Sequence, residues 1–133
     1  MGYESQVSGK FTIHPPLSNV ELRRDPLGAF PDAILMLFAK SRSKTDADGT
    51  VWTSQIGTEV RVQHEGRIRA YRLAEEVQAV ASAYPDHTFD GWIVRAGEEH
   101  GDVERLAIKD GAVVHEAATL TWPDGSQVEL GQG

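Results

Sequence analysis

The stretch AILMLFAKSRSKTDADGTVWTSQIGTEVRVQ, residues 33–63, decides the fold class. Two apolar-rich segments flank the sequence DADG at 46–49, which is typical of a turn because its glycine can adopt a positive φ. We therefore predict a β-hairpin of strands 33–45 and 50–63. Pairing Thr45 with Thr50 sets a register in which one apolar face should be buried. That face carries Leu35, Leu37, Ala39, Trp52, Ile56, Val60 and Val62.

Toward the N-terminus, residues 6–14 alternate between apolar and polar side chains, which predicts a half-buried strand with Phe11 and Ile13 on its inner face. The prolines at 15 and 16 end this strand, because neither can donate a ladder hydrogen bond. Ser18 and Glu21 then have the spacing of a helix capping box. Pro26 limits any helix here to one or two turns.

Toward the C-terminus, residues 70–84 contain the one long helical pattern. Leu73, Val77, Val80 and Tyr84 recur at helical spacing, and Pro85 ends the pattern. The other side of this helix carries Glu75, Glu76 and Gln78 and should face water. A helix of about 15 residues is marginal in isolation, so we expect it to pack on the sheet.

Strands are predicted again over 88–96, 103–109, 112–122 and 127–130. Asp110-Gly111 is a strong two-residue hairpin signal, and it places Arg105 opposite Glu116. Both faces of the 103–122 hairpin are apolar enough to be buried, so the pattern does not choose between them. The fold class is therefore α+β, a mostly antiparallel sheet of six or seven strands with one main helix, about 70–84, packed on one face.

The 133 residues fit a single domain, 1–133, with an ordinary core to which Trp52, Trp92 and Trp122 should contribute. The absence of cysteine excludes disulfides, thiolate metal sites and cysteine nucleophiles. No apolar run reaches the ~18 residues of a membrane span, and the N-terminus lacks the pattern of a signal peptide. We expect a cytoplasmic protein without membrane contact.

The formal net charge is −7, which argues against a general nucleic-acid binder. The charge is uneven along the chain. Residues 1–72 hold ten basic and eight acidic side chains, a net of +2, whereas residues 73–133 hold three and twelve, a net of −9. Such asymmetry can mark an interaction surface, although a solvated surface can also acquire it without function.

No catalytic, cofactor or metal site emerges from the sequence motifs. The five histidines have no paired spacing, and no nucleophile elbow or phosphate-binding loop is present. His87 follows the main helix, where an imidazolium would stabilise the helix C-terminus. The densest polar cluster contains Glu98, Glu99 and Asp102 in a predicted loop. These residues could form a partner-binding loop or hold a divalent cation, or they could simply solvate the loop.

Basic residues suggest a second candidate site. Lys40, Arg42 and Lys44 alternate along one strand face, where the predicted register also places Thr53 and Gln55, and Arg61 lies on the next strand. These four cations could bind an anionic nucleotide or another small anion. Alternatively, the charges only prevent edge-to-edge association of strands.

Several motifs give a resemblance to a family of small actinobacterial and actinophage proteins grouped as a domain of unknown function. They are MGY at 1–3, GxFxIxPPL at 9–17, HTFxGxI at 87–93, GEExxD at 97–102, RLxIxDG at 105–111 and WPD at 122–124. The resemblance covers both ends of the chain and is weaker over residues 24–66. It implies a phage or accessory-genome context rather than housekeeping enzymology, and it draws attention to Glu98, Glu99 and Asp102.

These observations lead to two functional hypotheses. The first is a non-enzymatic protein-interaction module that presents its acidic half or the loop at 98–104 to a protein partner. The second is a protein that sequesters an anionic nucleotide or small ligand with Lys40, Arg42, Lys44 and Arg61. The hypothesis that the protein is an enzyme has the least support in the sequence. A homodimer through an exposed edge strand at 127–130 is also possible.

Overall fold

The computed structural model describes residues 3–63 and 66–129 and confirms the α+β class. Every strand pair is antiparallel, and the paired strands form one sheet. The elements are β1 (Ser5–Leu17), α1 (Asn19–Arg23), the 3₁₀ turn η1 (Pro26–Ala29), β2 (Leu35–Thr45), β3 (Val51–Val62), β4 (Arg67–Ile68), α2 (Leu73–Ala83), β5 (Thr88–Ala96), β6 (Val103–Lys109) and β7 (Ala112–Ala117).

The sheet has the strand order β2-β3-β1-β5-β6-β7, and the short β4 pairs with the start of β1. The N-terminal strand is therefore central, with β3 on one side and β5 on the other. Phe11 is opposite Val60 of β3 and Gly91 of β5. The predicted alternation along β1 is confirmed, since Val7, Phe11 and Ile13 are buried while the polar residues between them are largely exposed.

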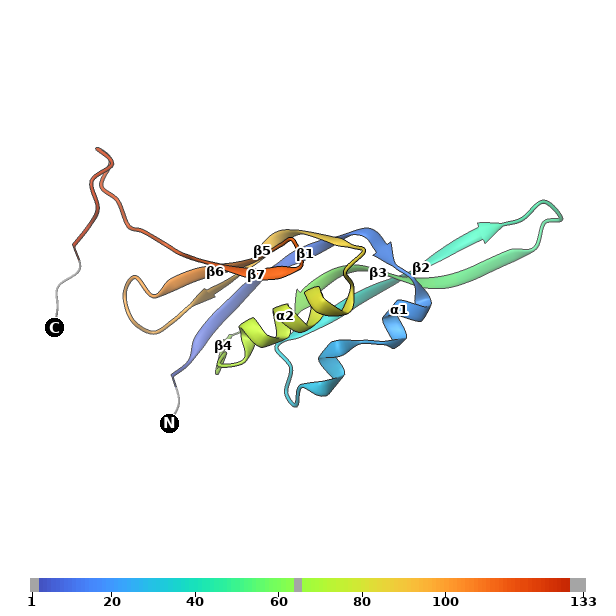
Figure 1. Cartoon of the computed structure of the whole chain (residues 1–133), viewed down its shortest axis with the longest axis horizontal. Helices are drawn as coiled ribbons and strands as arrows, with labels where there is room; N and C mark the ends of the chain where they lie inside the picture. The colour runs from blue at the N-terminus through green and yellow to red at the C-terminus, as the bar shows by residue number, and fades with distance from the viewer. Residues whose placement is uncertain (1–2, 64–65, 130–133) are drawn as a thin grey trace.

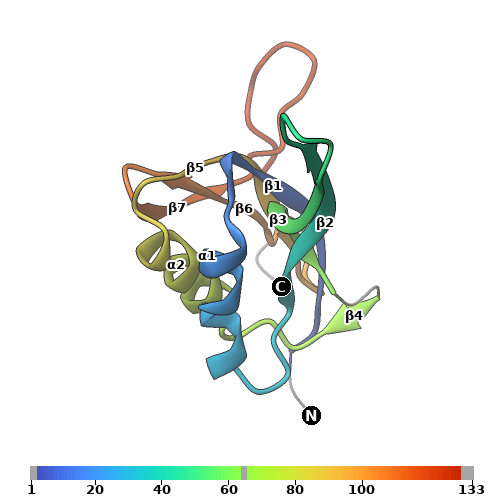
Figure 2. The ribbon, with the colours of Figure 1, turned by 90° about the vertical axis from the view of Figure 1, so that its right-hand side faces the viewer.

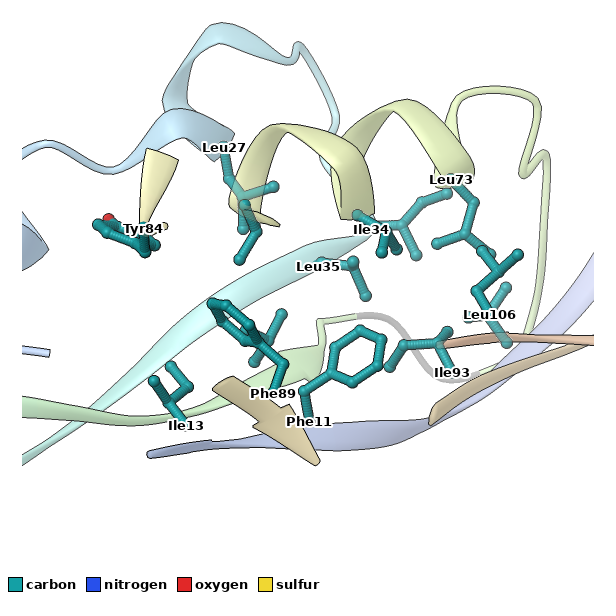
Figure 3. Close-up of a cluster of buried hydrophobic side chains, with 14 of the residues drawn as sticks. Phe11, Ile13, Leu27, Ile34, Leu35, Leu73, Tyr84, Phe89, Ile93 and Leu106 are labelled. Atoms are coloured by element: carbon teal, nitrogen blue, oxygen red, sulfur yellow. The ribbon is translucent and has the colours of Figure 1, made fainter. Parts of the chain in front are cut away.

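Both helices and η1 lie on the same side of the sheet (Figure 1). The core fills the space between them and the strands, as Figure 3 shows for residues from both layers. Phe11 and Phe89, from adjacent strands, meet edge to face with ring centroids 6.4 Å apart. Against them pack buried residues from the helical layer, including Leu27, Leu73, Val77, Val80 and Tyr84.

The main helix is confirmed, although α2 begins at Leu73 rather than residue 70. The expectation that Glu76 faces water is wrong, because its side chain is buried and Glu76 is only 2% exposed. Its Oε1 accepts hydrogen bonds from the backbone N–H groups of Ile34 and Leu35, each at 2.9 Å. Those two N–H groups are buried at the start of β2, and the carboxylate on α2 satisfies them.

The capping box before α1 is confirmed. Ser18 Oγ accepts from the N–H of Glu21 at 3.2 Å, and Glu21 Oε1 accepts from the N–H of Ser18 at 2.9 Å. This short helix lies over the end of β1 and β3, where the side chain of Leu22 is close to Gly57. The prediction that Pro15 and Pro16 end the first strand is wrong, because β1 continues through both prolines to Leu17, which pairs with Gly57 of β3.

The predicted hairpin exists, but its register differs from expectation. Thr45 pairs with Val51 rather than with Thr50, and a bulge between Phe38 and Ala39 shifts the pairing again. Asp46 explains the first shift, since its backbone N–H donates to Thr50 O and its carboxylate accepts from Thr50 N–H. Thr50 is thereby drawn into the turn, a side-chain effect that residue composition alone does not encode.

The expectation that the tryptophans contribute to the core is wrong. Trp52, Trp92 and Trp122 are 62%, 48% and 58% exposed. Trp52 lies in the outer half of the β2–β3 hairpin, which extends beyond the rest of the sheet (Figure 1). The helices do not reach that half, so its apolar residues have no layer to pack against.

The C-terminal strands are shorter than expected. β7 ends at Ala117, and beyond it the chain folds back only at a single Thr121–Gln127 bridge, so a strand over 127–129 is absent and Leu130 lies outside the described residues. The structure also settles which face of the β6–β7 hairpin is inside. Leu106 is buried in the core, and Ile108 and Val113 pack against it. In the described ranges, no helix is long and apolar enough to cross a membrane.

Candidate functional site

Strand alternation gives the sheet a second face, opposite the helices, which we call the open face. Trp92 lies here, because the next residue of β5, Ile93, is buried in the core on the helical side. Gly91 has φ +109°, and a Cβ at this position would lie 2.6 Å from the Lys10 carbonyl oxygen. Glycine therefore lets β1 and β5 approach closely beside the indole.

A pocket of about 420 Å³ surrounds Trp92 on the open face. The guanidinium of Arg105 lies 4.2 Å from the centroid of the indole, a cation–π contact. Arg105 Nη2 also donates to Glu116 Oε2 at 3.2 Å, which confirms the predicted cross-strand pair. Arg105 lowers the pKa of Glu116, so the carboxylate stays ionised at the rim. The remaining lining residues are Val94, Val103, Glu104, Ala117, Ala118 and Thr119.

The predicted interaction loop follows β5, and its three acidic residues have different environments. Asp102 turns inward, where its Oδ1 accepts from Arg95 Nη2 at 2.7 Å and its Oδ2 accepts from the hydroxyl of Tyr3. Arg95, and after it Tyr3, lower the pKa of Asp102. Glu98 and Glu99 are exposed at the loop. Asp102 therefore shapes the loop, and the two glutamates are left for contact.

Arg95 is the centre of this arrangement and was missed by the sequence reasoning. It also donates to Glu104 Oε1 at 2.9 Å and to Ser5 Oγ at 3.0 Å, and its pKa is raised by Asp102 and Glu104. One signal could have revealed it. Arg95 follows Phe89 and Ile93 at even spacing, so a charged residue occupies a position on the core side of the sheet.

The four candidate anion-binding residues divide into two groups. Lys40 and Arg61 line one pocket of about 430 Å³ on the open face, together with His14 and Phe38. Arg42 and Lys44 lie farther out on β2. The predicted neighbours are wrong, since Gln55 pairs with Ser41 and Thr53 with Ser43, on the other face of the hairpin. The shifted register and the bulge cause this difference.

Arg61 already has close partners. Its guanidinium lies 3.5 Å from the centroid of the Phe38 ring, and its Nε donates to Glu59 Oε1 at 2.6 Å. Glu59 Oε2 accepts from Lys10 Nζ at 2.6 Å, and Lys10 and Arg61 together lower the pKa of Glu59. Any anion in this pocket would compete with an ionised carboxylate for Arg61.

His87 does not cap α2 as expected. Its Nδ1 lies 2.6 Å from the carbonyl oxygen of Pro15, and its Nε2 lies 2.7 Å from Glu21 Oε2. Both neighbours are oxygen atoms that accept hydrogen bonds, so the ring lies between two acceptors from different elements. The ring thus joins the end of β1 to α1, and its role is structural.

Within residues 3–63 and 66–129, no three histidine or acidic side chains come together in a way that could hold a metal ion. The exposed glutamates of the 97–102 loop and the buried Glu76 are on separate elements. The Glu76 carboxylate already accepts hydrogen bonds from the backbone N–H groups of Ile34 and Leu35. The pocket around Trp92 combines aromatic, charged and apolar groups on one face of the sheet.

A protein-family model described as a family of unknown function (DUF6205) matches residues 1–131. The match includes the segment at 24–66, where the motif resemblance was weaker. No curated protein and no solved structure matches the chain.

Proposed function

We propose that this chain, which belongs to the DUF6205 family of unknown function, is a non-enzymatic protein-interaction module that binds its partner through the Trp92 pocket of the open face. The observation that carries the proposal is the pairing of a half-exposed indole with Arg105 in a pocket on an uncovered sheet face. Tryptophan and arginine are the residue types that most often dominate binding energy at protein interfaces.

The surroundings of the pocket support this proposal. Arg105 is held in place by Trp92 and Glu116, so little side-chain entropy remains to be lost when a partner binds. The pocket lining combines apolar residues, Val94, Val103 and Ala117, with the charged residues Glu104 and Glu116. Protein interfaces combine apolar contact area with polar groups in the same way.

The acidic loop extends the same surface. Residues 97–102 connect β5 to β6, the two strands that carry Trp92 and Arg105. Arg95 and Asp102 fix this loop and leave Glu98 and Glu99 exposed. A partner with a basic surface would be attracted by these carboxylates, chiefly through faster association. The motif resemblance to actinobacterial and phage proteins supports a cytoplasmic, accessory-genome setting for this interaction.

The test compares protein partners captured from a host lysate by the wild-type chain and by Trp92→Ser, at low and high salt. Trp52→Ser is the matched control, because Trp52 is also exposed but lies on the outer hairpin. We expect one partner to be lost with Trp92→Ser and kept with Trp52→Ser. Equal capture by the wild type and Trp92→Ser would contradict the proposal.

A second candidate function rests on the pocket lined by Lys40 and Arg61. Its two cations, with His14 and the Phe38 ring, could bind a small anion such as a nucleotide. A ligand present at 100 times its Kd should add about 2.7 kcal/mol to the free energy of unfolding. Thermal-shift measurements with a panel of nucleotides test this alternative, and the absence of any shift would retire it.

A further inference from the structure

The outer half of the β2–β3 hairpin, residues 39–56, is an exposed two-stranded ribbon that we call the basic arm. It begins at the bulge after Phe38 and extends away from the helices and the other strands (Figures 1 and 2). The residues of β2 from Ala39 to Thr45 are exposed, as are those of β3 from Val51 to Gln55. Successive strand residues point to opposite faces, so both faces of the ribbon contact solvent.

One face of the basic arm is cationic. Lys40, Arg42 and Lys44 lie on it, and their cross-strand partners are Ile56, Ser54 and Trp52. The strand segments 39–45 and 51–56 contain no acidic residue, so they carry a net +3 in a chain of net −7. Within the described part of the chain, no salt bridge involves these three cations.

The acidic residues of the arm are confined to its turn. The Asp46 carboxylate accepts from the N–H groups of Asp48 and Thr50 and from the indole N–H of Trp52. Asp48 accepts from Thr50 N–H at 2.9 Å. The Asp46 carboxylate therefore fixes the Trp52 indole beside Lys44, and with Asp46 and Asp48 included the whole arm, residues 39–56, has a net charge of +1.

The spacing of the cations suits the phosphates of a duplex. Alternate residues on a strand are ~6.6 Å apart. Lys and Arg side chains are long and flexible, so three cations at this spacing can each reach a phosphate along one DNA strand. The major groove of B-form DNA is ~12 Å wide and accommodates a two-stranded ribbon, whereas the major groove of duplex RNA is too narrow for side-chain access.

We propose that the basic arm inserts into the major groove of duplex DNA, with Lys40, Arg42 and Lys44 contacting phosphates. This activity is separate from partner binding at the open face. The exposure of both faces favours a groove, which encloses a ribbon, over an acidic protein surface, which would cover only one face. The opposite face offers hydroxyl and amide groups to the groove, from Ser41, Ser43, Thr53 and Gln55.

The overall negative charge limits this interaction without excluding it. The remaining residues of the chain together carry far more acidic than basic groups, and these would be repelled by DNA. The arm projects from the body, so only the ribbon needs to approach the phosphates (Figure 1). We therefore expect weak, salt-sensitive binding that does not depend on sequence.

The experiment is fluorescence anisotropy of a labelled 20-base-pair DNA duplex of arbitrary sequence, titrated with the full chain at several salt concentrations. Three phosphate contacts predict a slope of about −2.7 in log K against log salt, which is about a 40-fold loss of affinity between 50 and 200 mM. Lys40→Gln, Arg42→Gln and Lys44→Gln combined should abolish this salt-sensitive binding. The matched control combines Arg24→Gln, Arg69→Gln and Lys109→Gln, three exposed cations outside the arm, and should keep it.

Three results would overturn the proposal. The first is no binding to the duplex at 50 mM salt, and the second is equal binding by the triple arm variant and the wild type. The third is binding to polyglutamate or to anionic phosphatidylserine vesicles with none to DNA, which would assign the arm to an acidic protein or a membrane surface. Circular dichroism of both triple variants checks their folding. Trp92→Ser should bind DNA like the wild type, so failure of this proposal is distinguishable from failure of the open-face interaction.

Discussion

His87 and Glu21 form a direct link between the segment that follows α2 and the helix α1, with Nε2 of the ring 2.7 Å from Oε2 of the carboxylate. The histidine side chain is only 6% exposed. The same carboxylate closes the capping box with Ser18. The two side chains together couple the cap of α1, the end of β1 and the segment that leads into β5.

This link makes stability depend on pH in a definite direction. The Ser18 N–H and His87 lower the pKa of Glu21 below its ordinary value of 4.5. A carboxyl group with a lowered pKa in the folded state contributes stability above its ordinary pKa and loses it as the pH falls through the lowered value. We predict that Glu21→Gln is less stable than the wild type at pH 6 and that the two converge in the acid range. Urea denaturation at several pH values measures this, and a constant difference across the whole range would contradict it.

A second prediction concerns the buried carboxylate of α2. Glu76→Ala leaves the N–H groups of Ile34 and Leu35 buried without an acceptor. The free energy of unfolding should fall by about 1.5–3 kcal/mol for each hydrogen bond lost, the range for a hydrogen bond to a charged group. Glu75→Ala is the control, because its exposed pair with Arg72 should contribute less than about 1 kcal/mol. Equal effects of the two substitutions in urea denaturation would refute the role assigned to Glu76.

A third prediction distinguishes the two arginines of the β5–β6 region. Arg95→Met removes partners from Asp102, Glu104 and Ser5, so the 97–102 loop should open more often. Hydrogen exchange at the Gly97 amide, which donates to Asp102 O at 2.8 Å, should accelerate. Arg105→Met removes a half-exposed ion pair with Glu116 and the contact with the Trp92 ring, neither of which involves Gly97, and should leave this amide and overall stability nearly unchanged. If both variants protect Gly97 equally, Arg95 does not anchor the loop.

A fourth prediction follows from the exposure of the tryptophans. In the folded protein, Trp52, Trp92 and Trp122 should all be accessible to acrylamide, because each is about half exposed or more. Fluorescence quenching should therefore be nearly as efficient in the folded as in the unfolded chain. Strong protection of any one indole in the isolated folded protein would show that it is covered.

The sequence predicted the positions of the strands and helices more accurately than it predicted which of their side chains are buried. Alternation along β1, the capping box at Ser18 and the Asp110-Gly111 turn are local signals, and the structure confirms them. The tryptophans were misjudged because apolar character does not ensure burial when no second layer covers the strand. Glu76 was misjudged for the opposite reason, because a charged side chain can be buried where the fold supplies hydrogen-bond donors. Its burial depends on the backbone of β2, 41 or 42 positions away in the chain, which helical periodicity does not register.

In the candidate site, too, the sequence predicted the local pairing but not the contacts between distant segments. The Arg105–Glu116 pair followed from a two-residue turn, which fixes register locally. Trp92 joins that pair only because β5 lies beside β6, an arrangement set by the whole sheet. Likewise, Asp102 was identified as part of a polar loop, but its contact with Tyr3 joins residues 99 positions apart. Local patterns predicted the chemistry of these groups, and tertiary packing determined which of them meet.

The most direct test of the open-face proposal follows Trp92 alone. A variant carrying Trp52→Phe and Trp122→Phe retains one indole, in the pocket beside Arg105. When the partner captured by the wild type is added, the emission of Trp92 should shift to shorter wavelength and acrylamide quenching should fall, because the interface removes water from the ring. Binding that leaves both the emission and the quenching of Trp92 unchanged would contradict the assignment of this pocket as the interaction site.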